Sequence, residues 1–204
     1  MLDIEIREMR KQDYNKAIQF AIKGMHFDWY LDSKFLLNAY GKYFWYLEMN
    51  RATQIFAAYA EDSLVGILLA EFKDEPRKHN SFWQKFYVKF VDVIQKLFFK
   101  SGSGLYDAVN KELFAKYKET HSPDGEIIFL AADPDAKIKG IGTMLLNELT
   151  AIEKGKTVYL YTDNACTYQF YEHRGFERVG EKEVVLDLGN KKVPLTCLLY
   201  SKVL

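Results

Sequence analysis

DPDAKIKGIGT, residues 133–143, connects two apolar segments of different periodicity. The segment before it, EIIFLAA at residues 126–132, is a short and nearly continuous apolar run, which is typical of a buried β-strand. The segment after it, MLLNELTAIE at residues 144–153, repeats its apolar residues with the period of a helix. The sequence therefore predicts a strand, a tight turn and a helix, with two glycines and two lysines placed where the helix begins.

The start of this helix has several features that favour an anion. The first backbone N–H groups of a helix have no partner within it, and the helix dipole adds partial positive charge. Gly140 and Gly142 lack a Cβ atom, so a phosphate oxygen can come close to the neighbouring amides. Lys137 and Lys139 add positive charge at the same place. We therefore expect a phosphate site here, with an ordinary glycine-rich connection as the alternative.

Two common phosphate-binding patterns do not fit this part of the chain. The dinucleotide fingerprint requires a third glycine or alanine where Leu145 stands. The phosphate loop fails at residues 155–157, because Thr150 occupies the position of its first glycine.

The spacing does resemble the acyl-CoA signature of the GNAT superfamily of N-acetyltransferases. That signature has a proline, then glutamine or arginine, then a Gly-x-Gly or Gly-x-Ala pair; the matching positions here are Pro134, Lys137, Gly140 and Gly142. Lysine departs from the usual residue, but it still donates to phosphate as a point charge. The resemblance implies that the pyrophosphate of acetyl-CoA is bound by Lys137, Ile138, Lys139, Gly140, Ile141, Gly142 and Thr143.

A second stretch, NACTYQFYEHRGF at residues 164–176, resembles the second landmark of the same superfamily. The resemblance covers residues 126–202 and implies that Asn164 and Phe170 contact the cofactor. It also implies that Tyr171 binds near the cofactor sulfur and protonates the departing thiolate. A tyrosine with its ordinary pKa of about 10 is protonated at pH 7, which suits this role. The alternative is that Phe170 and Tyr171 only pack their helix on the sheet.

Acylation of an amine requires the neutral amine, and therefore a base. Deprotonating a lysine-like amine at pH 7 costs roughly 4.6 kcal/mol. Glu126 begins the strand before the turn, a position that resembles that of the general base in the histone-acetylating branch of the superfamily. The alternatives are a solvated carboxylate at the strand end and a chain of water molecules as the base. The resemblance also implies that the backbone of Leu130, Ala131 and Ala132 pairs with the cofactor and that an N–H there stabilises the oxyanion.

The overall composition limits other classes of function. The 28 basic and 28 acidic residues cancel, which gives no support for a nucleic-acid partner. Cys166 and Cys197 form no C-x-x-C pair and the four histidines share no metal-ligand spacing, so we expect neither a disulfide scaffold nor a metal. The first residues lack the apolar core of a signal peptide, and no apolar run reaches the ~18 residues of a membrane span. These features indicate a reducing, cytoplasmic setting.

The order of the expected elements indicates a mixed α/β (α+β) fold. We expect a single GNAT-like domain, 1–204, with a mixed and mostly antiparallel sheet of about six to seven strands flanked by helices. Residues 73–125 interrupt the strand pattern and predict a helical-hairpin insertion outside the usual outline of the superfamily. Asp13 is expected to cap the first helix, and a helix is expected over residues 164–174.

The expected insertion has an amphipathic pattern that is both aromatic and basic. Phe82, Phe86 and Phe90 recur at helical spacing, and residues 77–100 contain six Lys or Arg and one Asp. We expect this face to pack on the core, to shape the acceptor site or to form a homodimer contact. The alternative function is a non-catalytic acyl-CoA-fold module that uses residues 77–100 to bind a membrane or a protein.

On the enzymatic interpretation, the chain moves an acetyl group from acetyl-CoA to a primary amine by direct attack and a tetrahedral intermediate. The acceptor is expected to be a small molecule or a peptide, and the sequence carries no code that identifies it. We expect no nucleic-acid partner and no membrane contact.

Overall fold

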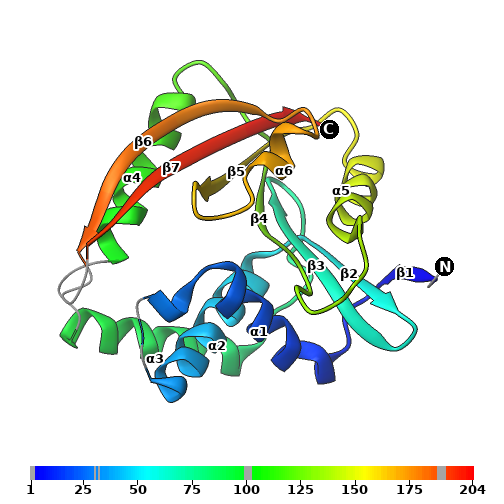
Figure 1. Ribbon diagram of the computed structural model, residues 1–204, viewed down its shortest axis with the longest axis horizontal. Helices are drawn as coiled ribbons and strands as arrows, with labels where there is room; N and C mark the ends of the chain where they lie inside the picture. Colours follow the sequence, from blue (N-terminus) through cyan, green and yellow to red (C-terminus); the bar gives the residue numbers. More distant parts are fainter. Residues whose placement is uncertain (1–2, 30, 32, 99–102, 188–191) are drawn as a thin grey trace. The chain divides into compact units, whose positions relative to one another are not determined.

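The computed structural model describes residues 3–29, 31, 33–98, 103–187 and 192–204 and confirms the expected fold class (Figure 1). In the described residues, seven strands follow the order β1-β2-β3-β4-β5-β7-β6 in a mixed, mostly antiparallel sheet. The strands are β1 (Ile4–Arg7), β2 (Gln54–Ala60), β3 (Ser63–Phe72), β4 (Gly125–Ala132), β5 (Thr157–Asp163), β6 (Glu177–Asp187) and β7 (Lys192–Val203). The helices are α1 (Tyr14–Gly24), α2 (Lys34–Arg51), α3 (Phe82–Phe98), α4 (Ser103–Tyr117), α5 (Ile141–Ile152) and α6 (Gln169–Glu172).

The chain divides into two compact units, and strand β4 contributes to both. The first unit is formed by Met1–Val91 and Ile127–Lys154, and the second by Asp92–Glu126 and Gly155–Leu204. The interpretation of residues 1–204 as a single domain stays a prediction.

In the first unit, β1, β2 and β3 form an antiparallel sheet whose faces carry different helices. Strands β2 and β3 pair from Gln54–Ala70 to Ala60–Ser63, as the hairpin pattern predicts. Helices α1 and α2 cover one face (Figure 1), and their apolar residues pack with those of the strands. The buried residues of this core include Ala17, Ile18, Phe20, Ala21, Trp45, Met49, Ile67 and Leu69.

Helix α5 packs closely against strand β3 in the same unit. A Cβ atom placed on Gly66 would lie 2.4 Å from Cγ2 of Ile141 and 3.2 Å from Cδ1 of Leu145. The absence of a side chain at Gly66 therefore sets how near the beginning of α5 comes to the sheet.

In the second unit, β7 is the central strand and pairs antiparallel with β5 and with β6. Strand β5 also pairs in parallel with the start of β4, at Gly125–Val158 and Glu126–Tyr159. Helix α4 lies along β6 and β7 (Figure 1). Its contacts include a hydrogen bond of 2.7 Å between the hydroxyls of Tyr117 and Ser201.

The segment 73–125, which we expected to form a helical insertion, contains α3 and α4. Their connection at residues 99–102 lies outside the described residues. Helix α3 belongs to the first unit as far as Val91, whereas α4 belongs to the second. No helix in the described part of the chain is both long enough and apolar enough to cross a membrane.

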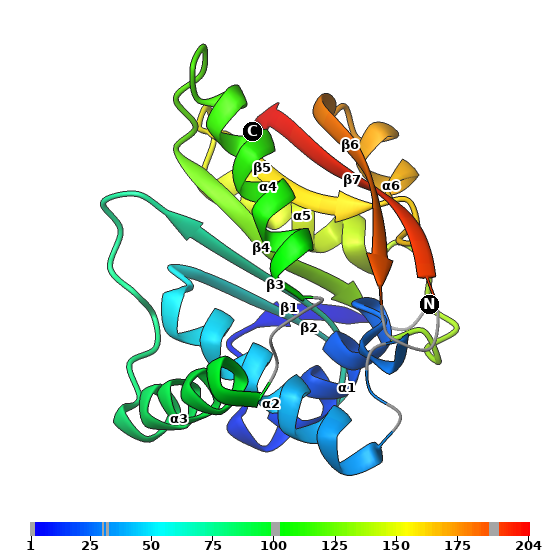
Figure 2. The same cartoon turned by 90° about the vertical axis from the view of Figure 1, so that its left-hand side faces the viewer.

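The expectation that the aromatic row of α3 packs on the core is wrong. Helix α3 lies beside α2 (Figure 2), and Tyr87 and Val88 form its inward face. Phe82, Phe86 and Phe90 point outward and are 73%, 57% and 56% exposed.

Two helix starts also differ from the expectation. Asp13 makes no side-chain capping bond to α1, because its carboxylate accepts hydrogen bonds from Arg10 and from the Tyr59 hydroxyl instead. The helix expected over residues 164–174 is confined to α6, Gln169–Glu172. The residues before α6 form turns that use the carboxylate of Asp163.

Candidate functional site

The turn after β4 is held in shape by its own backbone and by one aspartate. The backbone N–H of Asp133 donates to the carbonyl of Val65 in β3 at 2.8 Å, so strand pairing reaches the first residue of the turn. The Asp133 carboxylate accepts from the N–H of Asp135 at 3.0 Å, and its carbonyl accepts from Ala136 at 3.2 Å. These bonds form a compact turn that leads the chain toward α5.

Gly140 is the N-cap of α5 and adopts a left-handed conformation with φ of 87°. Glycine takes this conformation without the strain that a side chain would cause. No side-chain capping bond is made at this helix start, and the first intrahelical bond runs from Met144 N–H to the Gly140 carbonyl at 3.0 Å.

The predicted pyrophosphate residues lie together around this helix start. Their exposure differs: Lys137, Lys139 and Gly140 are exposed, Ile138, Gly142 and Thr143 are partly exposed, and Ile141 is buried. Ile141 can therefore contribute only its backbone to an anion site, since its side chain packs toward β3.

Two lysines of α1 neutralise the acidic side chains of the turn. Lys16 Nζ lies 2.9 Å from Asp133 Oδ2, and Lys23 Nζ lies 2.8 Å from Asp135 Oδ2. Burial favours protonation of Asp133, but the hydrogen bonds from Lys16 and from the Asp135 backbone outweigh it and hold the pKa of Asp133 below its ordinary value. The hydrogen bond to Asp135 raises the pKa of Lys23. A bound anion at this turn would therefore be repelled less by Asp133 and Asp135 than the sequence suggests.

In the second unit, the carboxylate of Asp163 organises the turn that leads to α6. Its Oδ1 accepts from the backbone N–H groups of Ala165 at 2.9 Å and Cys166 at 3.2 Å. Its Oδ2 accepts from the hydroxyl of Tyr106, in α4, at 3.2 Å. Burial raises the pKa of Tyr106, and the charge of Asp163 makes a smaller contribution in the same direction. This phenol therefore stays protonated and remains a hydrogen-bond donor.

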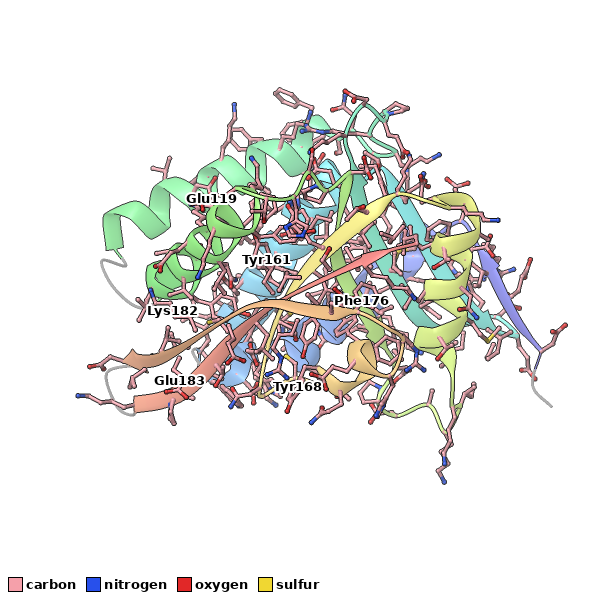
Figure 3. The ribbon with its side chains drawn as sticks, turned by 90° about the horizontal axis from the view of Figure 1, so that it is seen from above. Glu119, Tyr161, Tyr168, Phe176, Lys182 and Glu183 are labelled. Carbon is pink, nitrogen blue, oxygen red and sulfur yellow. The ribbon has the colours of Figure 1, made fainter. Side chains whose placement is uncertain are left out.

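Asn164 connects the same turn to strand β7 by two hydrogen bonds. Its backbone N–H donates to the carbonyl of Thr196 at 3.1 Å, and its side-chain carbonyl accepts from the Thr196 N–H at 2.9 Å. Asn164 and Thr196 help to line a concavity of about 470 Å³ next to Glu183, which is labelled in Figure 3. The predicted contact between Asn164 and the cofactor stays a prediction.

Tyr171 is partly buried among aromatic rings in the second unit. Its ring centroid lies 5.2 Å from that of Phe170, 5.6 Å from Phe176, which Figure 3 labels, and 6.2 Å from Tyr200. Burial raises the pKa of Tyr171, and the neighbouring Cys166 thiol makes a smaller contribution in the same direction. Its hydroxyl makes no hydrogen bond to any of the described residues, so a protonated donor is available for a ligand atom.

Phe170 and Glu126 are both engaged by neighbouring side chains. The guanidinium of Arg174 lies 3.8 Å above the Phe170 ring, which fits a packing role as well as a cofactor contact. Glu126 is partly buried and accepts a hydrogen bond of 3.0 Å from the Tyr159 hydroxyl. Phe114 of α4 stacks on the Tyr159 ring at 4.3 Å, which restrains this hydroxyl.

The structure brings the predicted residues together in two groups. Leu130, Ala131 and Ala132 at the end of β4 belong to the first unit with residues 137–143, and Ala132 is exposed. Glu126, Asn164, Phe170 and Tyr171 belong to the second unit. Among the described residues, no cluster of His, Cys, Asp and Glu is arranged to hold a metal ion.

Sequence reasoning missed three residues that shape these groups: Lys16, Lys23 and Tyr106. The two lysines are seven residues apart and so lie on one face of a helix, which was a detectable signal. Nothing in the sequence identified their partners. Tyr106 carried no signal at all, because its partner Asp163 is 57 residues away.

Comparison with known proteins supports one family. The model of the acetyltransferase (GNAT) family matches residues 104–176. Peptidyl-lysine N-acetyltransferase YjaB of Salmonella typhimurium is 38% identical over 71 residues, which cover 35% of this chain and 48% of that protein. The match thus spans about half the length of this curated relative.

Solved acetyltransferases share the fold at low sequence identity. PaiA N-acetyltransferase from Thermoplasma acidophilum, solved with coenzyme A, is 15% identical with a TM-score of 0.53 and 99% of each chain covered. An agmatine N-acetyltransferase is 14% identical with a TM-score of 0.60, and 99% of this chain and 100% of that one are covered. The polyamine N-acetyltransferase of Drosophila melanogaster is 14% identical with a TM-score of 0.56 and the same coverage.

The family model, the curated relative and the solved structures all point to the GNAT superfamily of acetyltransferases, and the family model matches only residues 104–176 of this chain. The region matched by the family model begins within α4. It therefore includes part of the segment that we expected to lie outside the outline of the superfamily.

Proposed function

We propose that this protein is an acetyl-CoA-dependent N-acetyltransferase that acts on a primary amine. The observation that carries the proposal is the corner between β4 and α5, where a left-handed Gly140 begins a helix without a side-chain cap beside exposed Lys137 and Lys139. Such a corner suits the diphosphate of coenzyme A. The match of residues 104–176 to the acetyltransferase (GNAT) family favours an acetyl thioester over other anions, and the PaiA structure named above contains coenzyme A.

The backbone donors at this corner can supply a useful share of the binding free energy. A hydrogen bond to a charged group contributes about 1.5–3 kcal/mol, so two bonds from α5 to phosphate oxygens would contribute roughly 3 kcal/mol or more. That corresponds to an affinity gain of more than about a hundredfold. The lysines add attraction that weakens as salt is increased.

The acceptor amine must lose a proton as it attacks the thioester carbon. Glu126 is our candidate base, and the bond from the Tyr159 hydroxyl orients its carboxylate. Attack forms a C–N bond and a tetrahedral intermediate whose negative oxygen needs a donor. A backbone N–H of residues 130–132 is our candidate for that donor.

Collapse of the intermediate breaks the C–S bond and releases the thiolate of coenzyme A. Full proton transfer from a phenol to a thiolate is uphill by roughly 2 kcal/mol at ordinary pKa values of about 10 and about 8.5. The raised pKa of Tyr171 increases this difference. We therefore assign Tyr171 the role of a hydrogen-bond donor that stabilises the thiolate, with solvent supplying the proton.

The names of the relatives given above support a proposal for the class of acceptor. Their names specify agmatine, polyamines and peptidyl lysine, each of which has a primary aliphatic amine. We propose an acceptor of the same class.

The proposal is tested by measuring heat stabilisation with acetyl-CoA and thiol release with spermidine, agmatine and a lysine peptide. Gly142→Glu should abolish stabilisation by acetyl-CoA, because it adds bulk and negative charge to the first turn of α5. Gly104→Glu is a matched control, since Gly104 is the second residue of α4 and a Cβ there meets no atom within 4 Å. Retained stabilisation in Gly142→Glu would contradict the assignment of the diphosphate to this corner.

A further inference from the structure

The outward side of α3 carries four exposed aromatic side chains, and three of them are in contact with one another through Trp83. Phe82 and Trp83 are 73% and 76% exposed, and Phe86 and Phe90 are 57% and 56% exposed. The ring of Trp83 lies 5.8 Å from Phe82 and 6.5 Å from Phe86 in edge-on contacts. We call these four residues the α3 aromatic face. Large contiguous apolar patches on a protein surface mark interaction sites more often than scattered apolar residues do.

The opposite side of α3 is already committed to packing within the first unit. The Tyr87 hydroxyl donates to the Ala39 carbonyl of α2 at 3.0 Å, and Val88 is 9% exposed. The amide of Asn50 in α2 also donates to Gln84 at 3.3 Å. The helix could not turn the aromatic face inward without losing these contacts, so this face is available for another molecule.

Basic residues outnumber acidic ones around the aromatic face, where Asp92 follows Lys89 by three residues. Residues 77–91 contain four basic residues, Arg77, Lys78, Lys85 and Lys89, and no Asp or Glu. Lys85 and Lys89 are one helical turn apart, and Lys89 follows Phe82 and Phe86 by seven and three residues, which places it on the same side of the helix. A second copy of the chain would bring an identical positive rim against this one, whereas an anionic surface would complement it.

We propose that the α3 aromatic face docks peripherally on a membrane surface that contains anionic lipids. Aromatic side chains enter the boundary between headgroups and acyl chains, and flanking lysines reach the lipid phosphates. The geometry fits a helix lying in the plane of the interface, with α2 behind it. We expected no membrane contact from the sequence, because apolar rows at helical spacing usually pack within a protein or against a second copy.

The test is co-sedimentation of the full chain with phosphatidylcholine vesicles, prepared with and without phosphatidylserine. We expect binding only to the anionic vesicles and loss of binding at high salt. Phe86→Ser with Phe90→Ser should weaken binding by at least roughly tenfold, because two buried phenyl groups are lost. Lys85→Gln with Lys89→Gln should weaken it roughly 30-fold, at about 1 kcal/mol for each lysine.

Matched controls separate this effect from a general loss of apolar or basic surface. Ile152→Ser removes a residue that is 51% exposed on α5, and Lys11→Gln with Lys154→Gln removes two exposed lysines elsewhere. These controls should bind vesicles like the parent, and circular dichroism should show that all variants are folded.

Three results would overturn the proposal. The first is no binding to anionic vesicles. The second is equal binding to neutral vesicles, which would remove the role of the lysines. The third is a dimer in sedimentation equilibrium that dissociates in the Phe86→Ser and Phe90→Ser variant, because a second copy would then cover this face. None of these measurements depends on acetyltransferase activity.

Discussion

Replacing Gly66 by alanine should damage the candidate diphosphate corner, because the new side chain would point from strand β3 at the first residue of α5. The new Cβ would lie 2.4 Å from Cγ2 of Ile141, whereas non-bonded carbon atoms are in favourable van der Waals contact at about 3.5 Å or more. Ile141 must therefore move by about 1 Å. Its Cγ2 is bonded directly to Cβ and the residue is 2% exposed, so the side chain cannot swing into open space.

The size of the effect follows from two opposing contributions. Overpacking of a core typically costs about 1–3 kcal/mol, while replacing a glycine within a strand recovers about 0.5–1 kcal/mol. We expect a net loss of about 1–2 kcal/mol in the free energy of unfolding. Ile141 is the first residue of α5, so its displacement also moves the helix start. Loss of one charge-assisted bond to phosphate would weaken acetyl-CoA binding by about tenfold or more.

The assay combines denaturant unfolding with calorimetric titration of acetyl-CoA. Gly180→Ala is a matched control in the second unit, because its nearest contact would be 3.3 Å to Cδ2 of Leu113, the end of a flexible side chain. We expect the control to change stability by less than about 1 kcal/mol and to bind acetyl-CoA like the parent.

A double-mutant cycle tests the assigned contact directly. Ile141→Ala removes Cγ2 and should cost about 2–4 kcal/mol by itself. Combined with Gly66→Ala, it should cost less than the sum of the two single changes by about 1 kcal/mol or more. Additive costs, or a Gly66→Ala variant with parental stability and affinity, would refute the reasoning.

Three further predictions concern the chemistry and the turn. Tyr171→Phe should lower kcat by about a hundredfold with little change in acetyl-CoA affinity, and an unchanged kcat would remove Tyr171 from the reaction. Glu126→Gln should reduce kcat/KM more at pH 7 than at pH 10, where more of the amine is neutral; a uniform loss in the pH profile would argue against a base. The lowered pKa of Asp133 stabilises the fold above the unfolded pKa of about 3.9, and this stabilisation is lost as pH falls through the folded value. Asp133→Asn should therefore lower the unfolding free energy at pH 7 by about 1 kcal/mol and weaken its decline on acidification, and parallel acid-unfolding curves would contradict this.

The strand, turn and helix around residues 133–143 could be predicted because their signals are local. An apolar run, a pair of glycines and an apolar period of 3.6 residues lie within about 30 residues of sequence. At these positions, the local sequence was sufficient to predict the secondary structure.

Where the expectations were wrong, specific side-chain contacts that the sequence pattern does not reveal decided the outcome. The aromatic face of α3 points outward because the Tyr87 row meets α2, and both rows have helical periodicity. The helix expected from Asn164 starts later, because Asp163 supplies an acceptor for the backbone N–H groups of two residues in the turn. Periodicity identifies a helix but does not choose between two apolar faces.

The positive charge of the candidate diphosphate corner depends on a helix that its motif does not contain. Within residues 133–139, Asp133 and Asp135 cancel Lys137 and Lys139, so the motif by itself has no net charge. In the folded chain, Lys16 and Lys23 of α1 pair with the two aspartates. The aspartates then cancel less of the positive charge of Lys137 and Lys139. An anion within about 8 Å of this turn would respond to that local balance, because charges farther away are screened. The electrostatics of the corner are therefore a property of the first unit and of its packing, whereas the left-handed glycine and the uncapped helix start are properties of the motif.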